Sequence, residues 1–184
     1  GTATKSLAKM GLVVGGLAAS LVFAFKKSFD FIDALGKTSL RTGITTKTLQ
    51  AFQLAAIESG SSIEQTQKGL IKFARSIGDA GRGLKTQADI FKDLGVEIKN
   101  SDGTLKSFDE ILMQTADGIK NLGSDMERTN ALANLFGRSG AMMSEVFRNG
   151  AQGLEEFMQR AKRLGIILDQ DIIDRTQKFN DSVA

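Results

Sequence analysis

The chain has 184 residues and carries 24 lysines and arginines against 21 aspartates and glutamates, a net charge of +3. That surplus is too small and too dispersed to predict a nucleic-acid-binding protein by itself. The chain has no cysteine and no histidine, which excludes disulfides, thiolate metal sites, a thiol nucleophile and the most common general base. No convergent pair of carboxylates stands in for these groups, so we expect no enzyme, no catalytic residue, no metal, no cofactor and no small-molecule substrate.

The distribution of proline and glycine predicts the fold class. The chain contains no proline and 20 glycines, and many glycines directly follow stretches with helical apolar periodicity, where a helix C-terminus favours a left-handed residue. We predict an all-α array of roughly eight short amphipathic helices after an apolar N-terminal helix, with a small extended excursion near residues 96–105. Because the chain begins at Gly1 and not at methionine, we expect it to be cut from a longer protein.

Residues 1–35 are predicted to form an apolar N-terminal helix whose uncharged run covers residues 10–25 and is flanked by lysines. At 1.5 Å per residue this run is roughly 24 Å long, short of the ~30 Å hydrocarbon core of a bilayer. Two interpretations remain open: contact with the host membrane, or burial against other copies through a stripe of small residues. The residues proposed for membrane contact or self-association are Gly11, Leu12, Val13, Val14, Gly15, Leu17, Ala19, Leu21, Phe23 and Phe25.

Residues 36–184 are predicted to form a helical body with no further domain boundary. After a break at Gly43, apolar residues at helical spacing continue to Gly60. Ser61 and Glu64 have the spacing of a capping box, in which each side chain accepts a hydrogen bond from the other's backbone N–H. The following amphipathic helix is expected to end before a loop at residues 78–83.

The middle of the body combines a short helix with turn-forming residues. A helix around 87–94 is expected to stop at Gly95, and Asn100-Ser101-Asp102-Gly103 predicts the turn of a loose hairpin. Part of this segment imitates a calcium-binding loop, through Asn100, Asp102, Gly103, Leu105 and Asp109. Ile98 occupies the position of the first ligand, so we favour a plain turn.

The C-terminal half contains the clearest helix signals. Capping boxes are predicted at Ser107/Glu110 and at Ser124/Glu127, each before an amphipathic helix. After a break at residues 137–140, short helices are expected around 142–147, 154–164 and 172–183.

Two polar features admit a functional interpretation beside a structural one. Residues 56–60 followed by a helix with Gln65, Gln67, Lys68 and Lys72 have the layout of a helix-turn-helix. Thr66 departs from that motif, because the position usually buries an aliphatic side chain. Arg138 is expected to pair with a carboxylate or to cap the carbonyls of the preceding helix.

The order of the breaks resembles the helical region of phage tail tape measure proteins over residues 34–180. The matching residues lie in sequence, and LFGRSG at 135–140 is the most characteristic segment. The set is LGKTSLRTGI at 35–44, LQAF at 49–52, AAIESG at 55–60, LGV at 94–96, DG at 102–103, LFGRSG at 135–140, NGAQGL at 149–154, AKRLG at 161–165 and FND at 179–181. Such proteins are much longer than this chain, and the muralytic or peptidase domains of some members are absent from it.

The resemblance implies a structural virion protein inside the phage tail tube, where it sets the tube length. It also implies ejection with the DNA and a role in the path across the host cell envelope. The implied partners are copies of the chain, as a trimer or hexamer, with tail tube and tail tip proteins and, after ejection, the host membrane. Genomic DNA lies nearby without specific readout. Structural roles are implied for Gly43, Gly60, Gly95, Phe136, Gly137, Arg138, Gly140, Gly150 and Gly165. A membrane-active or pore-forming helical module and a DNA-binding helix-turn-helix domain are the alternatives.

Overall fold

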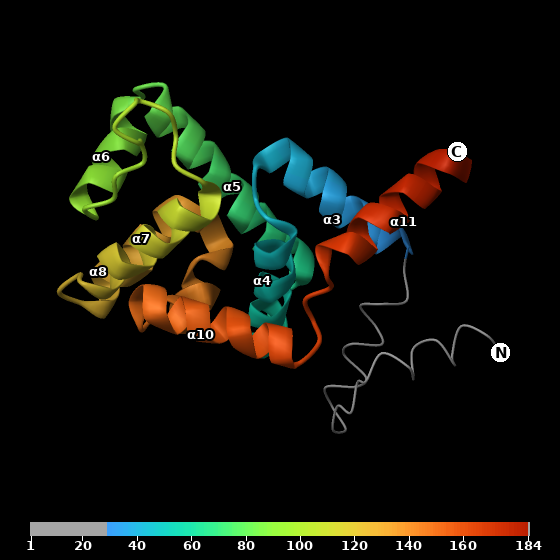
Figure 1. Ribbon diagram of the computed structural model, residues 1–184. Helices are drawn as coiled ribbons and strands as arrows, with labels where there is room; N and C mark the ends of the chain where they lie inside the picture. Colours follow the sequence, from blue (N-terminus) through green and yellow to red (C-terminus); the bar gives the residue numbers. More distant parts are fainter. Residues whose placement is uncertain (1–28, 184) are drawn as a thin grey trace.

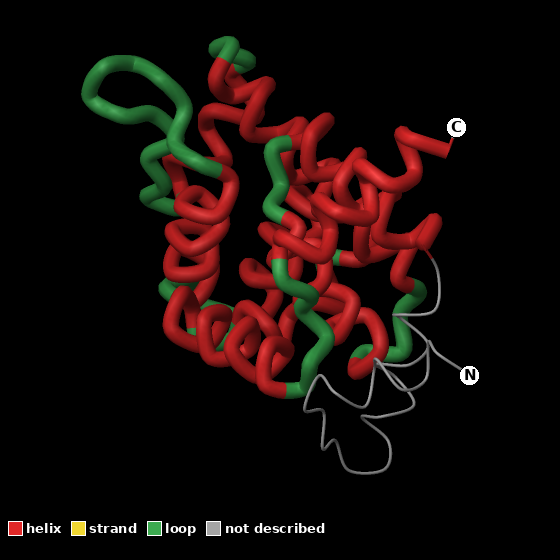
Figure 2. The backbone as a smooth tube through the Cα atoms, turned by 45° about the vertical axis from the view of Figure 1, so that its right-hand side comes forward, coloured by secondary structure: helices red, strands yellow, loops and turns green. Residues whose placement is uncertain are grey.

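The computed structural model describes residues 29–183. Within this range the chain forms α-helices connected by short loops, together with two short 3₁₀ helices, η1 and η2 (Figure 1). The elements are α3 (Phe29–Thr42), α4 (Thr46–Glu58), α5 (Ile63–Gly81), α6 (Lys85–Asp93), α7 (Phe108–Lys120), α8 (Asp125–Phe136), η1 (Gly137–Ser139), η2 (Ala141–Met143), α9 (Ser144–Phe147), α10 (Gly150–Arg163) and α11 (Gln170–Val183). The predicted all-α class is confirmed for the described residues, which contain no strand (Figure 2). The predicted boundary between residues 35 and 36 falls inside α3.

Helices that are distant in the sequence pack against one another. The longest helix, α5, contacts α4, α6 and α8, while α10 lies against both α7 and α4. The two ends of the described chain also meet, because α3 and α11 pack side by side at one end of the molecule (Figure 1). Most of these helices are short and amphipathic, and α4 is buried on nearly all sides, so their stability depends on these contacts.

Phenylalanine rings connect the helices through the core. Phe73 of α5 stacks on Phe136 of α8, with ring centroids 4.6 Å apart and an angle of 19° between the planes. Phe73 also contacts Phe91 at 5.9 Å and Phe108 at 5.4 Å. On the other side, Phe136 contacts Phe147 at 5.1 Å. Through these five rings, helices α5, α6, α7, α8 and α9 share one apolar core.

The predicted helix starts are mostly found at the predicted residues. Ser107 and Glu110 form the complete capping box at the start of α7, which confirms that prediction. Ser124 caps α8 by accepting a hydrogen bond from the Glu127 backbone N–H, but the Glu127 carboxylate accepts from Ser124 Oγ and not from its backbone N–H, so only half of that predicted box forms. The predicted box at Ser61 and Glu64 is wrong by one residue, because Ser62 is the N-cap of α5 and accepts from the backbone N–H of Gln65.

The predicted loop at residues 78–83 is also wrong in part. Helix α5 continues to Gly81, because packing holds its last turn in place. Ala80 is buried, and the side chain of Leu105 lies so close to Gly81 that a Cβ there would be 2.9 Å from a Leu105 methyl. Tertiary contacts therefore override the helix-breaking tendency of the glycines.

The extended excursion consists of a loose hairpin with a single antiparallel bridge between Lys99 and Leu105. The turn between them is closed by a backbone hydrogen bond, in which Gly103 N–H donates to Asn100 O at 3.0 Å. This distance is typical of an N–H···O hydrogen bond. The predicted plain turn is thus the observed structure. The predicted apolar run at residues 10–25 lies outside the described residues.

Candidate functional site

The segment from Phe136 to Gly140 joins α8 to the 3₁₀ helices and lies against α5. Phe136 is buried and supplies the ring that stacks on Phe73. Gly137 follows it with φ 74° and ψ −153°, a combination that is essentially restricted to glycine. The Gly137 backbone N–H donates to Ala133 O and so ends α8. The most characteristic motif of the sequence therefore forms a tight turn anchored by an aromatic ring.

Gly140 is required in this turn for a different reason. Its φ of −58° and ψ of −44° are open to any residue, but a Cβ built on it would lie 2.1 Å from the carbonyl oxygen of Leu132. Gly69, on the facing side of α5, is in a similar position. A Cβ there would lie 2.2 Å from Ser139 Oγ and 3.0 Å from Phe136 O. The turn approaches α5 at Gly69 and α8 at Gly140 so closely that a side chain at either glycine would require a shift of its neighbours. No sequence pattern distinguishes Gly69 from the other glycines of the chain.

Arg138 takes neither of the two roles predicted for it. Its side chain is exposed, and no carboxylate or helix carbonyl within residues 29–183 is bonded to it. Lys72 of α5 instead donates from Nζ to Ala133 O at 3.2 Å, which stabilises the C-terminal end of α8. The cation that caps this helix thus comes from a neighbouring helix.

The five other motif glycines share a positive φ. Gly43, Gly60, Gly95, Gly150 and Gly165 all have φ between 68° and 72°. At Gly60, Gly95 and Gly165 the backbone makes the hydrogen bonds of a Schellman motif, as in the bond from Ile166 N to Ala161 O at 3.1 Å. These glycines satisfy the last carbonyls of their helices and turn the chain, which is a structural task.

Gly150 differs from the other four because it starts a helix. Asp117 of α7 accepts a hydrogen bond at Oδ1 from the backbone N–H of Ala151, at 2.8 Å. A Cβ on Gly150 would lie 2.4 Å from the same oxygen. The carboxylate therefore seats the N-terminus of α10 against α7, where a negative charge is favourable. No local pattern pointed to Asp117, since its partner is 34 residues away.

Asp109 makes a second contact between distant helix ends. Its carboxylate accepts hydrogen bonds from Thr45 Oγ1 at 3.0 Å and from Thr48 Oγ1 at 2.8 Å. These bonds join the start of α7 to the start of α4. In the imitation of a calcium loop, Asp109 would have been the closing ligand. Within the described residues, no group of acidic side chains is arranged to hold a metal ion.

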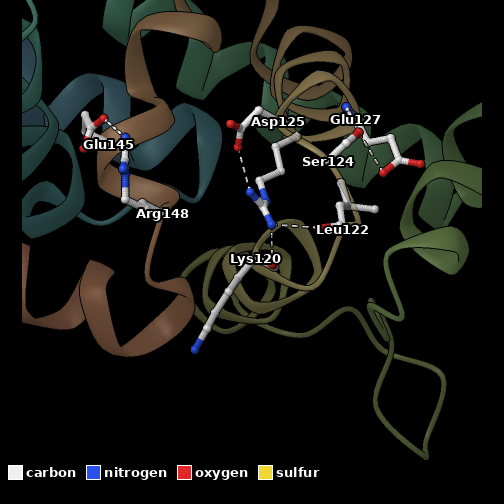
Figure 3. Close-up of polar contacts among 8 residues, drawn as sticks. Lys120, Leu122, Ser124, Asp125, Glu127, Glu145 and Arg148 are labelled. Atoms are coloured by element: carbon white, nitrogen blue, oxygen red, sulfur yellow. Dashed lines mark hydrogen bonds and ion pairs between the residues drawn. The ribbon is translucent and has the colours of Figure 1, made fainter.

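Arg128 holds the corner between α7 and α8, where Figure 3 labels its partners Leu122 and Asp125. Arg128 donates to Leu122 O at 2.9 Å and to Asp125 Oδ1 at 2.7 Å, and so covers the end of α7. Beside it lies a groove of about 290 Å³ whose other rim carries Arg148, paired with Glu145. Both guanidinium groups already bind partners within the chain, so their role here is to stabilise the corner and not to bind a ligand.

A stripe of polar residues on α4 contacts the segment that leads into α11. Thr46 Oγ1 donates to Gln170 Oε1 at 2.6 Å, and Gln50 Oε1 accepts from the Leu168 backbone N–H at 2.8 Å. Gln53, on the same stripe, is 1% exposed, yet neither amide atom has a hydrogen-bond partner among the described residues. Docking of the segment that leads into the C-terminal helix therefore includes polar contacts with α4.

The ionisable groups with shifted pKa values are all exposed. Hydrogen bonds from the Thr104 side chain and backbone lower the pKa of Asp102, and the Lys68 ammonium lowers the pKa of Glu64. The buried polar side chains of the described residues are all threonine, serine or glutamine. The described residues thus bring together structural caps and close glycine contacts, without a buried ionisable group.

The helix-turn-helix alternative places its recognition residues on α5. There Lys68 pairs with Glu64 at 2.7 Å, and Lys72 is the residue that caps α8. Thr66 is buried. Two of the four side chains proposed to read bases therefore have partners within the chain.

No helix in the described part of the chain is both long enough and apolar enough to cross a bilayer. Comparisons with protein-family models, with curated proteins and with solved structures gave no significant match.

Proposed function

We propose that this chain is an internal, non-enzymatic segment of a phage tail tape measure protein. In this role it occupies the tail tube of the virion during assembly, belongs to the protein that sets tube length, and leaves with the DNA toward the host cell envelope. Its partners are copies of itself, as a trimer or hexamer, and the tail tube and tail tip proteins.

The proposal is supported by the structural roles of the motif residues that carry the resemblance to tape measure proteins. Phe136 stacks in the core, Gly137 ends α8, and Gly140 allows a carbonyl to approach. The remaining motif glycines end helices or begin one. The motif residues therefore stabilise the fold, as expected for a structural protein.

The proposal is tested by following the chain in particles of the phage that encodes it. Peptides of the chain are quantified by mass spectrometry in purified virions, in tailless heads and in virions after triggered genome release. We expect the peptides in intact virions alone, because the protein enters with the tail and leaves with the DNA. Peptides that are missing from tails, or that stay in the particle after release, contradict the proposal.

A membrane-active or pore-forming module is the second candidate, and it depends on the uncharged run at residues 10–25. Flotation with liposomes separates the two. The full chain is compared with a chain lacking residues 1–27. If both versions float equally, the apolar run is not the membrane contact, and if neither floats, the second candidate is excluded.

A further inference from the structure

We propose that the groove between α3 and α5 binds the phosphodiester backbone of double-stranded DNA. This inference concerns the charges of the folded body and does not depend on the proposed tail function. It also differs from the helix-turn-helix alternative, because the ligand is the phosphate backbone and no bases are read.

The groove has a volume of about 520 Å³ and carries three arginines against one carboxylate. Arg41 comes from α3, Arg75 comes from α5, and Arg82 is the C-cap residue that follows α5. Among the residues that the structure describes, only Arg82 of the three has an ion-pair partner, Asp79 at 2.5 Å. The groove thus holds an excess of two positive charges in a chain whose net charge is +3. Because guanidinium groups present fixed donors that match phosphate oxygens, this composition favours an oxyanion ligand.

The floor of the groove leaves room for a backbone to approach. Ala74 and Gly78 line it between the arginines, and a Cβ added at Gly78 would meet no atom within 4 Å. Thr38 lies on the α3 side and supplies a hydroxyl group near the rim. The groove therefore has small residues at its floor and hydrogen-bond donors at both rims. Arginine and threonine donors of this kind contact phosphate oxygens in protein–DNA complexes.

The positive charge continues beyond the groove, which favours a polymer over a single anion. Along α5, the exposed Lys72 precedes Arg75, and its charge stays uncompensated because its partner is the neutral carbonyl of Ala133. Lys68, one turn earlier, is paired with Glu64. Residues 72–82 cover roughly 15 Å at 1.5 Å per residue, enough to span several phosphates of one strand, which recur about every 3.4 Å along the duplex axis. A concave groove accepts a ridge such as a DNA strand, whereas a flat anionic membrane would contact only its rims.

The test measures binding of a short fluorescent DNA duplex to the full chain by anisotropy at several salt concentrations. The groove variant is Arg41→Gln/Arg75→Gln/Arg82→Gln. The charge-matched control is Lys92→Gln/Lys99→Gln/Lys162→Gln, whose residues are exposed and do not line the groove. A third variant replaces the same three arginines by lysine, which keeps the charge. Circular dichroism checks the helix content of all variants.

We expect the groove variant to bind at least about tenfold more weakly than wild type at roughly 50 mM salt, with a salt slope shallower by about 2.7, since each phosphate contact contributes about 0.9. The lysine variant should keep the wild-type slope, and the control should lose less than about threefold. Equal losses in the groove variant and the control, or a wild-type chain that does not bind DNA, would overturn the proposal. So would binding to anionic vesicles together with no binding to DNA.

Discussion

Two glycines near the end of α8 meet different demands. Gly137 is needed for its backbone conformation, because φ is 74° and ψ is −153°. Gly140 has ordinary helical angles and is needed because the Leu132 carbonyl leaves no room for a side chain. In a sequence the two look alike, so only the structure separates a conformational requirement from a spatial one.

The spatial requirement predicts the effect of Gly140→Ala. The added methyl group would lie on the Leu132 carbonyl oxygen, so the turn must shift, and we expect a loss of about 1–3 kcal/mol in the free energy of unfolding. Gly78→Ala is the matched control, since it adds the same group to α5 in open space. That variant should be as stable as wild type or more stable by up to about 1 kcal/mol. Urea denaturation measures both, and equal stability of the two variants would contradict the argument.

For single residues, the sequence predicts which glycines have a positive φ better than it predicts which glycines lie in close contact with another segment. The positive φ of Gly43, Gly60 and Gly95 follows from their places after apolar periodic stretches. The need for glycine at residue 118 is different, because a Cβ there would lie 2.4 Å from Leu94 O, a residue of another helix end. Likewise, Lys72 and not Arg138 caps α8, because α5 packs against α8 and brings Lys72 to the Ala133 carbonyl.

At the scale of the element, local capping signals predict where helices begin, and neighbouring serines limit the precision. The Ser107/Glu110 pair is correctly predicted because both hydrogen bonds lie within one turn. At Ser61 and Ser62 the spacing allows two starts, and the structure uses the second. The seat of α10 on Asp117 could not be predicted in this way, since its donor and acceptor belong to different helices.

The capping box of α7 predicts a dependence of stability on pH. Hydrogen bonds from the Ser107 side chain and backbone hold the pKa of Glu110 below its ordinary 4.5. A lowered pKa in the folded state means that the carboxylate stabilises fully above pH 4.5 and loses this contribution as the pH falls through the folded value. We therefore expect Glu110→Gln to lower the melting temperature at neutral pH, with a gap to wild type that closes in acid. A gap that stays constant between neutral and acidic pH would contradict this origin.

At the scale of the whole molecule, the helices depend on one another through Phe73. Its ring contacts Phe91, Phe108 and Phe136, so Phe73→Ala removes contacts to three segments at once. We expect a loss of about 3–5 kcal/mol in the free energy of unfolding. Leu40→Ala is the control, because Leu40 is 83% exposed, and its effect should stay within about 0.5 kcal/mol. Calorimetry measures both, and a loss below that of an average core truncation would show that the rings are not coupled.

The two ends of the described chain lie together, because α11 packs on α3. The fold is therefore much shorter than the same residues would be if they were drawn out along one axis. Residues 29–183 drawn out as one continuous helix would extend roughly 230 Å at 1.5 Å per residue. Folded compactly, they have a radius of gyration of about 15 Å and a diameter of about 40 Å. Forty or so residues inserted at the tip of the Lys99–Leu105 hairpin would then enlarge a loop, where the same number in a single helix would add about 60 Å. If the proposed tail function holds, electron micrographs of phage carrying that insertion should show tails of unchanged length. Tails that lengthen in proportion would mean that this body unfolds before it is measured against the tube.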